Sequence, residues 1–347
     1  MNEVRIPIER LRRFVVDALK SVDVRDHDAS IVADVLVEAD MREIFSHGTA
    51  RLARYITAVQ NKEIDVTALP EFISQRGATA VLDAHHLFGQ VAGILAIDKA
   101  KELASKSGIG LVTVRNSCHF GIAGFYAERA LPEMIGVAMT NTSPLVVPTF
   151  GKQAVLGTNP IAFAAPTSGD NWLMDLSTSV ISRGKIEVFD RENKPLDQGW
   201  AVDSNGLPCT DPKTMLKILA NRLDGGICPM ADYKGYGLSA MVDIFSGILS
   251  GAGFGLDVGG QGHANIGHSF IAININFFME PNDFISRLDK FCLQLKNSAA
   301  EGQKVFLHGE KENIARRLSI SKGVILKPEN KLALNLLAEK MGLKVLE

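Results

Sequence analysis

Apolar side chains in the first part of the chain recur every three or four positions, the spacing of an amphipathic helix. One stripe follows Pro7, a residue favoured in the first turn of a helix, and comprises Leu11, Phe14, Val15, Ala18 and Leu19. A second follows Asp26, a candidate N-terminal cap, and comprises Ile31, Val32, Val35, Leu36 and Ala39. Residues 51 to 59 repeat this spacing of apolar side chains, and the segment that starts at Pro281 shows mainly the same helical spacing. Both ends of the chain are therefore predicted to be helical.

The middle of the chain alternates short apolar runs with longer amphipathic stretches. The short runs predict strands at residues 80–83, 109–114, 135–140 and 270–275. The longer stretches predict helices at residues 91–105, 124–131, 212–219 and 237–251. Helix at both ends around a mixed centre favours an α+β protein. In it, residues 1–70 and 285–347 form a helical domain that clasps a central α+β domain of residues 71–284.

Composition and charge exclude several classes of partner. The 347 residues include 37 Lys and Arg against 39 Asp and Glu, which leaves no basic surface for nucleic acid or an anionic membrane. Only 7% of the residues are aromatic, which disfavours base stacking. The four cysteines form no CxxC pair, and no apolar run reaches the ~18 residues of a membrane helix. Because a signal-peptide pattern is also missing, we expect a cytoplasmic protein that binds neither nucleic acid nor membrane.

Two short histidine motifs lie far apart in the sequence. One is Ser46-His47-Gly48 with Arg51 four positions after the histidine, and the other is the run 116–121, which contains His119 and follows a predicted strand. Histidine moves protons near neutral pH and arginine grips carboxylates, so the pair suggests acid/base chemistry on an anionic substrate. The alternatives are that each histidine is a hydrogen-bonded core residue, and that Arg51 pairs with Glu43 or Asp40 on a solvated helix face.

Standard nucleotide and metal signatures are absent. Residues 251–255 are rich in glycine, but Leu256 stands where G-x-G-x-x-G requires its third glycine, and the segment follows a predicted helix instead of a strand. The remaining histidine clusters, His85-His86 and Gln261-Gly262-His263 with His268, match no metal-binding spacing. We therefore expect no Rossmann domain and no metal site.

Several glycine-containing polar turns have the composition of ligand-binding loops, although each one alone is ordinary. They are residues 141–144, 157–160, 175–179, 184–185 and 232–237. The last of them precedes an apolar helix whose N-terminus can receive a phosphate, with Lys234 as the counter-charge.

These motifs, in this order, resemble the malate/L-lactate dehydrogenase family that lacks a Rossmann domain. Its relatives include ureidoglycolate, sulfolactate and diketogulonate oxidoreductases and a cyclic-imine reductase. The matches span nearly the whole chain: 46–48 with Arg51, 116–121, 141–144, 157–160, Asp175 with 178–179, 184–185, 199–200 with Asp203, 211–212, 233–237 and 267–268.

The resemblance implies hydride transfer between NAD(H) or NADP(H) and a small 2-oxo/2-hydroxy acid of the malate/oxaloacetate or lactate/pyruvate type. It also implies a mainly antiparallel, non-Rossmann cofactor sheet and a homodimer whose active site lies between domains. His119 and His47 match the catalytic positions, with Ser46 beside them, and Arg51 matches a position that binds the substrate carboxylate. Which histidine carries the proton stays open.

The resemblance further assigns a set of cofactor-binding positions: Ser143, Asn159, Asp175, Leu176, Ser177, Lys185, Lys234, Gly235, Gly309 and Glu310. Two departures from the family pattern lie among them. His308 replaces the proline that precedes the Gly-Glu pair, and Asp232 replaces a small residue before Tyr-Lys-Gly. Each departure weakens the assignment of its neighbours.

Alternatives to a malate or lactate dehydrogenase remain. The substrate can instead be a cyclic imine, sulfolactate or ureidoglycolate, and neither substrate identity nor NAD versus NADP is readable from the motifs. A non-catalytic ligand-binding relative has no need for two histidines beside an arginine, and a metal-dependent hydrolase lacks its ligand spacing.

Overall fold

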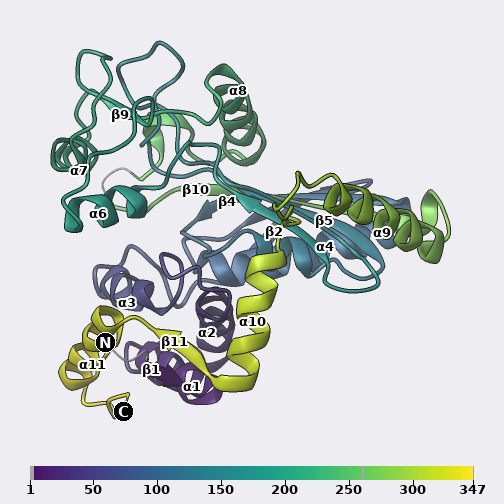
Figure 1. Ribbon diagram of the computed structural model, residues 1–347. Coiled ribbons are helices and arrows are strands. Elements are labelled where there is room, and N and C mark those ends of the chain that lie inside the picture. The colour runs from purple at the N-terminus through teal and green to yellow at the C-terminus, as the bar shows by residue number, and fades with distance from the viewer. Residues whose placement is uncertain (1–3, 260–261, 347) are drawn as a thin grey trace.

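The computed structural model of the chain describes residues 4–259 and 262–346. Three hydrophobic cores organise it. Figure 1 shows a helical lobe that holds both chain ends, a central sheet that extends away from it, and a smaller lobe above the near end of the sheet. The expectation of a mixed α+β fold is confirmed. The division into two domains at residues 70 and 285 stays a prediction.

The helical lobe combines the two ends of the chain around one core. Its elements are β1 (Val4–Ile6), α1 (Ile8–Lys20), α2 (Asp26–Met41), η1 (Thr49–Arg51), α3 (Leu52–Gln60), α10 (Glu310–Lys322), β11 (Val324–Leu326) and α11 (Pro328–Met341). The antiparallel pair of β1 and β11 joins the two ends. The predicted stripe of α1 is buried in full, which explains why this segment folds as a helix against α2.

A seven-stranded sheet forms the centre of the molecule, in the order β2-β3-β4-β10-β5-β6-β7. Its strands are β2 (Glu71–Arg76), β3 (Thr79–Asp83), β4 (Ile109–Ser117), β5 (Met134–Thr140), β6 (Ile161–Ala165), β7 (Trp172–Leu176) and β10 (Ile266–Asn274). Only β3 and β4 run parallel within it. The mainly antiparallel sheet expected from the resemblance is therefore present.

Helices pack closely on this sheet because glycines let the backbones approach. A Cβ on Gly110 of β4 would lie 2.0 Å from the carbonyl oxygen of Ala100 in α4 (Gly89–Ser107). A Cβ on Gly136 of β5 would lie 2.0 Å from the carbonyl oxygen of Ala127 in α5 (Gly124–Glu128). Farther along the sheet, α9 (Pro281–Asn297) lies beside β7, where Trp172 and Phe291 stack with ring centroids 6.3 Å apart (Figure 1).

The smaller lobe has a core of its own. Its elements are α6 (Arg183–Arg191), β8 (Ala201–Val202), α7 (Pro212–Asn221) and β9 (Gly226–Ile227). The next segment returns to the sheet as α8 (Tyr233–Val242), a six-residue π-helix η2 (Asp243–Ile248) and two short 3-10 turns, η3 (Gly255–Asp257) and η4 (Ile275–Phe277). Asp211 caps α7 by accepting from the amides of Lys213 and Thr214.

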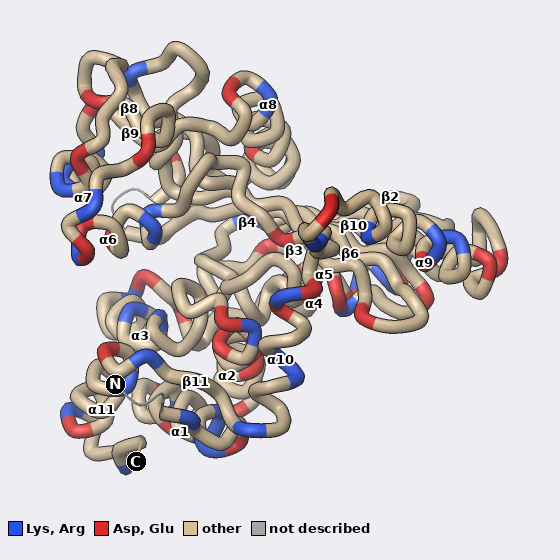
Figure 2. Tube along the Cα trace, in the orientation of Figure 1, with Lys and Arg blue, Asp and Glu red and all other residues tan. Residues whose placement is uncertain are grey.

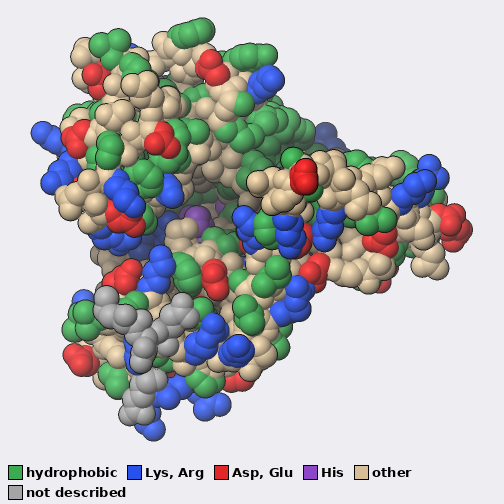
Figure 3. Space-filling view, viewed as in Figure 1, with side chains coloured by type: hydrophobic (Ala, Val, Ile, Leu, Met, Phe, Trp, Pro, Cys, Tyr) green, Lys and Arg blue, Asp and Glu red, His purple; other side chains and the backbone are tan. Residues whose placement is uncertain are grey.

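Charges of both signs are interspersed over all three parts (Figure 2). No helix among the described residues is both long and apolar enough to cross a membrane. The space-filling view shows a hollow between the helical lobe and the smaller lobe, with a histidine side chain at its base (Figure 3). The site described below lies in this hollow.

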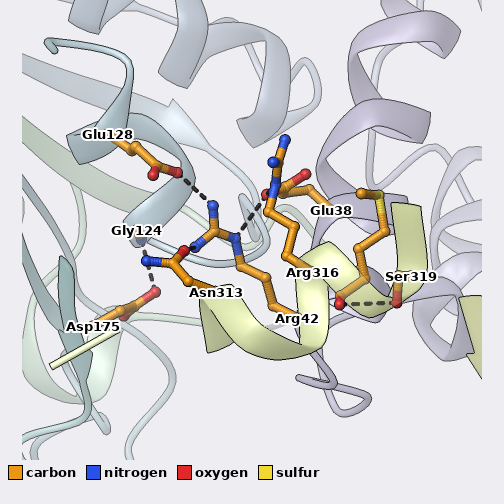
Figure 4. A network of polar contacts seen from close by, with 9 residues as sticks. Glu38, Arg42, Gly124, Glu128, Asp175, Asn313, Arg316 and Ser319 are labelled. Atoms are coloured by element: carbon orange, nitrogen blue, oxygen red, sulfur yellow. Dashed lines mark hydrogen bonds and ion pairs between the residues drawn. The ribbon is translucent and has the colours of Figure 1, made fainter. Parts of the chain in front are cut away.

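A buried arginine joins the helical lobe to the sheet (Figure 4). Arg42, directly after α2, donates to Glu38 at 2.7 Å, to Glu128 of α5 at 2.5 Å and to Asn313 of α10 at 3.2 Å. Its side chain is 3% exposed, so all three helices converge on one desolvated charge. Such a charge is stable only while its partners are in place.

We predict that Arg42→Met lowers the free energy of unfolding by about 3 kcal/mol, because it leaves the carboxylates of Glu38 and Glu128 without their shared buried partner. Arg12→Met is the matched control, since Arg12 pairs with Asp34 at an exposed site and should cost under about 1 kcal/mol. Urea unfolding of both variants measures the two losses. Equal losses would show that the buried arginine does not hold the lobes together.

Candidate functional site

Strand ends gather the candidate residues at one edge of the sheet. Cross-strand neighbours at this edge are Ser117 with Ile266, Thr140 with His268, Met139 with Ile161, and Ile161 with Leu176. Strands β4, β5 and β7 therefore end where β6 and β10 begin. The loops that follow them carry the His119 motif, the turn at 141–144 and the segment after Asp175, so segments distant in sequence meet here.

The two histidine motifs converge. The imidazoles of His47 and His119 are stacked, with centroids 5.5 Å apart and an angle of 25° between the rings. His47 lies on the loop between α2 and η1, and its Nδ1 is 2.8 Å from the hydroxyl of Ser46. Both rings are half-buried. Burial, followed by the nearby charge of Arg51, lowers the pKa of His47 to about 4.

Arg51 lies near both rings, because its charge acts on His47 and on His119. Its Nε donates to the carbonyl oxygen of Ser46 at 2.7 Å, and it forms no ion pair with Glu43 or Asp40 within the described residues. Burial lowers the pKa of Arg51, although an arginine remains charged at neutral pH. A half-buried guanidinium without an acidic partner is suited to bind an anion.

Asp40 is fully buried beneath the loop that carries His47. Its Oδ2 accepts from the backbone amide of Thr49 at 2.8 Å and from the Thr49 hydroxyl at 2.6 Å. A Cβ on Gly48 would lie 1.8 Å from Oδ1 of Asp40, so only glycine fits between His47 and Thr49. The glycine of the Ser-His-Gly motif is thus explained by a carboxylate eight residues earlier in the chain.

His119 is held by residues that the sequence did not single out. The hydroxyl of Tyr55, on α3, lies 2.7 Å from Nδ1 of His119, and the backbone amide of Gly121 donates to the same nitrogen at 3.3 Å. Gln90 of α4 donates to the Tyr55 oxygen at 2.8 Å. Tyr55 follows Arg51 by four positions on a predicted helix, a spacing that places both on one face and was the available signal. Nothing in the sequence points to Gln90.

The electrostatic surroundings keep His119 neutral. Burial lowers its pKa well below the ordinary value, and the charges of Arg51, His47 and Arg54 lower it further. Burial raises the pKa of Tyr55 to about 12, so its hydroxyl keeps its proton at neutral pH. The resting site therefore contains neutral imidazoles and a neutral phenol beside two arginines.

A stack of rings supports the His119 loop from below. The ring of Phe120 lies between His268 and Tyr126, with centroid distances of 4.6 and 4.7 Å. His268 is fully buried, and its two nitrogens lie 2.7 Å from the hydroxyl of Thr140 and 2.8 Å from that of Ser117. Burial lowers the pKa of His268 to about 3, so this ring is a neutral structural residue.

A cavity of about 250 Å³ lies next to this edge, between β7 and the start of α10. Asp175 lines it, and its Oδ2 accepts from the amide of Gly124 at 2.7 Å (Figure 4). Asp175 is exposed where it lines the cavity. Gly309 also lines the cavity, with φ of +84° and only 2.9 Å between a would-be Cβ and the Leu173 backbone. The backbone at Gly309 therefore packs directly against the backbone of Leu173 in the cavity wall.

His308 and Glu310 flank Gly309. The carboxylate of Glu310 is engaged by Lys296, Lys304 and the amide of Leu307, so it holds this loop in place. His308, which replaces the expected proline, lines both this cavity and a neighbouring one of about 310 Å³. Its ring lies 5.8 Å from that of Trp172.

The other cofactor candidates form a second group near the start of α8. The backbone of Thr178, next to Ser177, accepts from Met230, whose own carbonyl accepts from the amide of Gly235. Lys234 is exposed in the first turn of α8. Asn159 is fully buried, and its amide group is occupied by the Thr142 amide, the Ser239 carbonyl and Asp243. The Asn159 side chain therefore shapes the loop of Ser143 and has no free polar atom.

Lys185 lies on the far side of the hollow. It is in the first turn of α6, and its ammonium lies 4.9 Å from the ring centroid of Phe189. A Cβ on the preceding residue, Gly184, would be 3.7 Å from the Cβ of Ser46, so α6 faces the His47 loop. Leu176 ends β7 and pairs with Ile161, which fixes Asp175 and Ser177 on either side of it.

The remaining histidines lie elsewhere. His86 and His263 stack with centroids 3.6 Å apart, and His263 Nδ1 is 3.0 Å from the carbonyl oxygen of Glu63. Gln261, the neighbour that completed this sequence cluster, lies outside the described residues. Across 4–259 and 262–346, no three His, Cys, Asp or Glu side chains are grouped so that they could hold a metal ion.

Comparisons with known proteins agree on one family. The family model described as malate/L-lactate dehydrogenase matches residues 6–335. A malate dehydrogenase of Pyrococcus abyssi is 40% identical over 100% of this chain and 97% of the relative, and an L-sulfolactate dehydrogenase of Methanocaldococcus jannaschii is 39% identical over 88% of each. The crystal structure of a malate dehydrogenase from Entamoeba histolytica has a TM-score of 0.94 at 31% identity and covers 99% of both chains.

We predict that Asp40 makes the folded protein less stable as pH rises. Burial raises its pKa to about 7, whereas an unfolded Asp titrates near 3.9, so the folded state holds this proton more tightly. Stability is therefore lost between about pH 4 and pH 7, at ~1.4 kcal/mol per pKa unit. Asp40→Asn should remove this part of the pH dependence, measured as Tm against pH. Asp34→Asn, an exposed position on the same helix, should leave it in place; identical slopes in both variants would contradict the assignment.

Proposed function

Because the chain belongs to the malate/L-lactate dehydrogenase family, we propose that it interconverts malate and oxaloacetate with NAD(H) or NADP(H). One observation carries the proposal: Arg51, which forms no ion pair among the described residues, lies near two stacked neutral imidazoles. A cation for the carboxylate and an imidazole for the carbonyl oxygen are the groups that reduction of a 2-oxo acid requires.

A second arginine favours a substrate with two anionic groups. The charge of Arg54 acts on His119, Tyr55 and Arg51, so Arg54 lies near all three. It makes no hydrogen bond or ion pair within the described part of the chain, and it is exposed. Arg51 and Arg54 can therefore bind the two carboxylates of oxaloacetate, whereas pyruvate has only one. Sulfopyruvate also carries two anionic groups and is the second candidate, consistent with the sulfolactate-specific relatives.

The residues present fit a nicotinamide cofactor. The cavity of Asp175 and Gly309 offers a carboxylate for ribose hydroxyls and a glycine wall for close backbone approach. The start of α8, with Lys234 and Gly235, offers a helix N-terminus and a cation for a phosphate. Ser143 follows the end of β5, Ser177 follows the end of β7, and Lys185 lies in the first turn of α6; we assign all three to the same cofactor site.

When bound, such a cofactor supplies the hydride to C2 of the substrate. Arg51 binds the carboxylate next to C2 and so fixes which face of the carbonyl is presented. One of the two histidines donates a hydrogen bond to the carbonyl oxygen and delivers the proton that this oxygen needs as C2 becomes a carbinol. The stacked partner ring and the ring stack below exclude water from one side of the site.

We also propose that the protein works as a homodimer and that α8 with η2 and η3 forms the interface. Large apolar side chains are exposed along this segment: Tyr233 66%, Tyr236 39%, Leu238 36%, Ile244 55%, Ile248 54%, Leu249 54%, Phe254 48% and Leu256 52%. Figure 3 shows hydrophobic side chains gathered there. Monomers rarely expose so many large apolar side chains on one continuous segment, whereas a dimer interface would bury them.

We predict saturable binding of NADH or NADPH and reduction of oxaloacetate faster than pyruvate. Arg51→Gln should raise KM about 10²-fold for both acids, while Arg54→Gln should raise it mainly for oxaloacetate. A spectrophotometric assay with oxaloacetate, pyruvate, sulfopyruvate and a cyclic imine, each with both cofactors, measures these changes. No saturable cofactor binding would overturn the proposal; binding without turnover of any acid would identify a non-catalytic relative.

We predict that Ile248→Glu converts the dimer into monomers, because a carboxylate at the centre of the patch cannot be buried unpaired. Light scattering should then give the 37.5 kDa of one chain, against twice that mass for the wild type. Leu332→Glu, on the opposite lobe and also exposed, is the control and should stay dimeric. Monomeric wild-type protein, or a dimer that survives Ile248→Glu, would refute this interface.

A further inference from the structure

Nδ1 of His119 faces two hydrogen-bond donors. The backbone amide of Gly121 can only donate, and it points at this nitrogen from 3.3 Å. The Tyr55 hydroxyl is 2.7 Å away on the other side. A nitrogen that accepts from a backbone amide cannot carry a proton of its own without losing that bond. The neutral ring therefore holds its proton on Nε2.

The direction of the Tyr55 hydroxyl is also fixed. Gln90 is fully buried and donates its side-chain amide to the Tyr55 oxygen at 2.8 Å. The Tyr55 oxygen is thus already an acceptor, and the acceptor within reach of its proton is Nδ1 of His119. Gln90, Tyr55 and His119 form a chain of donors that runs from the interior toward the hollow.

The far end of this chain is free. Nε2 of His119 has no hydrogen bond within the described residues, and it is not among their buried unpartnered polar atoms. The ring is flanked by Arg51 and Arg54 on the α3 side, by His47 on the neighbouring loop and by His268 beneath it, all of which oppose a second proton. On α6, Glu187 and Arg183 face Arg51. Cys118, the adjacent residue, has a thiol whose pKa burial raises to about 12.

We propose that Tyr55 is a positioning residue that keeps the proton of His119 on Nε2 and replaces that proton during the reaction. This inference rests on the proposed function. As hydride reaches C2, the Nε2–H bond breaks and the substrate O–H bond forms. The Tyr55 O–H bond breaks as Nδ1–H forms. The phenolate left on Tyr55 is stabilised by the Gln90 amide and the nearby charge of Arg51.

The same contacts return the protons of His119 and Tyr55 to their starting positions after the reaction. The amide of Gly121 opposes a proton on Nδ1, so this proton returns to the Tyr55 oxygen while Nε2 takes one from solvent water. The net proton consumed comes from water, as reduction of a 2-oxo acid requires. His47 differs, because among the described residues its Nδ1 has one hydrogen-bond partner, the exposed hydroxyl of Ser46. A substrate-binding role is left for His47.

The tautomer is measured directly on the wild-type protein. Long-range ¹H–¹⁵N NMR of protein labelled with ¹⁵N-histidine, with His119 assigned by its loss in His119→Gln, should show the neutral Nε2–H form at pH 7.5. An Nδ1–H tautomer or an imidazolium at this pH would overturn the proposal. The result does not depend on turnover, so it separates failure of this inference from failure of the proposed function.

Kinetics test the relay. With neutral His119 and neutral Tyr55 as the donors, kcat for reduction should change less than about 3-fold between pH 6.5 and 9. Tyr55→Phe should lower kcat about 10²-fold with KM changed far less, and should make kcat fall with rising pH, because only the imidazolium of His119 can then donate. Thr57→Val removes an exposed hydroxyl on the same helix and should match the wild type. A flat profile and an unchanged kcat in Tyr55→Phe would refute the relay.

Discussion

The site depends on the hydrogen bonds of one buried imidazole, that of His268. Its two nitrogens reach the hydroxyls of Thr140 and Ser117, and so join the edge residues of β4, β5 and β10. These bonds are available because the ring is neutral, a state that burial enforces by lowering its pKa to about 3. His268 also stacks on Phe120, which fixes the direction in which the preceding residue, His119, leaves the sheet. A charged or smaller side chain at this position would loosen three strand ends together.

The charged side chains beside the histidines are positive, so a bound anion would supply the negative charge. Two arginines, Arg51 and Arg54, lie near neutral rings and form no ion pair within residues 4–259 and 262–346, and the buried carboxylate of Asp40 faces Thr49 instead of either arginine. An anion that binds here is paired with cations whose positions the fold has already fixed, so little reorganisation remains to oppose binding. The same cations keep His119 from gaining a second proton before substrate arrives, which is why a proton relay and not a resting imidazolium fits the geometry.

Periodicity predicted the parts of the fold that local sequence controls. The stripe of α1 and the strands around residues 80–83, 109–114, 135–140 and 270–275 formed as expected, because burial of alternate or helical faces is a local property. The helix α7 was expected from its spacing at residues 212–219, but its separate core with α6 was not predicted, because the core joins side chains from segments far apart in the chain. Within the site, Tyr55 and Gln90 were missed because their roles arise from contacts 64 and 35 positions apart in the chain. Asp40 was considered as a surface partner for Arg51; its burial depends on the packing of α2, which no local pattern encodes.

One arginine links the loop that carries His47 to the cavity lined by Asp175 and Gly309. Arg42 ends α2 and opens the loop that carries His47, and it also lines the cavity of Asp175 and Gly309. Its bond to Asn313 fixes the first turn of α10, while its bond to Glu128 fixes α5, whose first amide holds Asp175 (Figure 4). A displacement of α10 by a ligand in the cavity would therefore be transmitted through a buried charge that tolerates no unpaired partner. The Arg42 guanidinium thus ties the end of α2 to α5 and to the first turn of α10, while Glu38 is shared with Arg316.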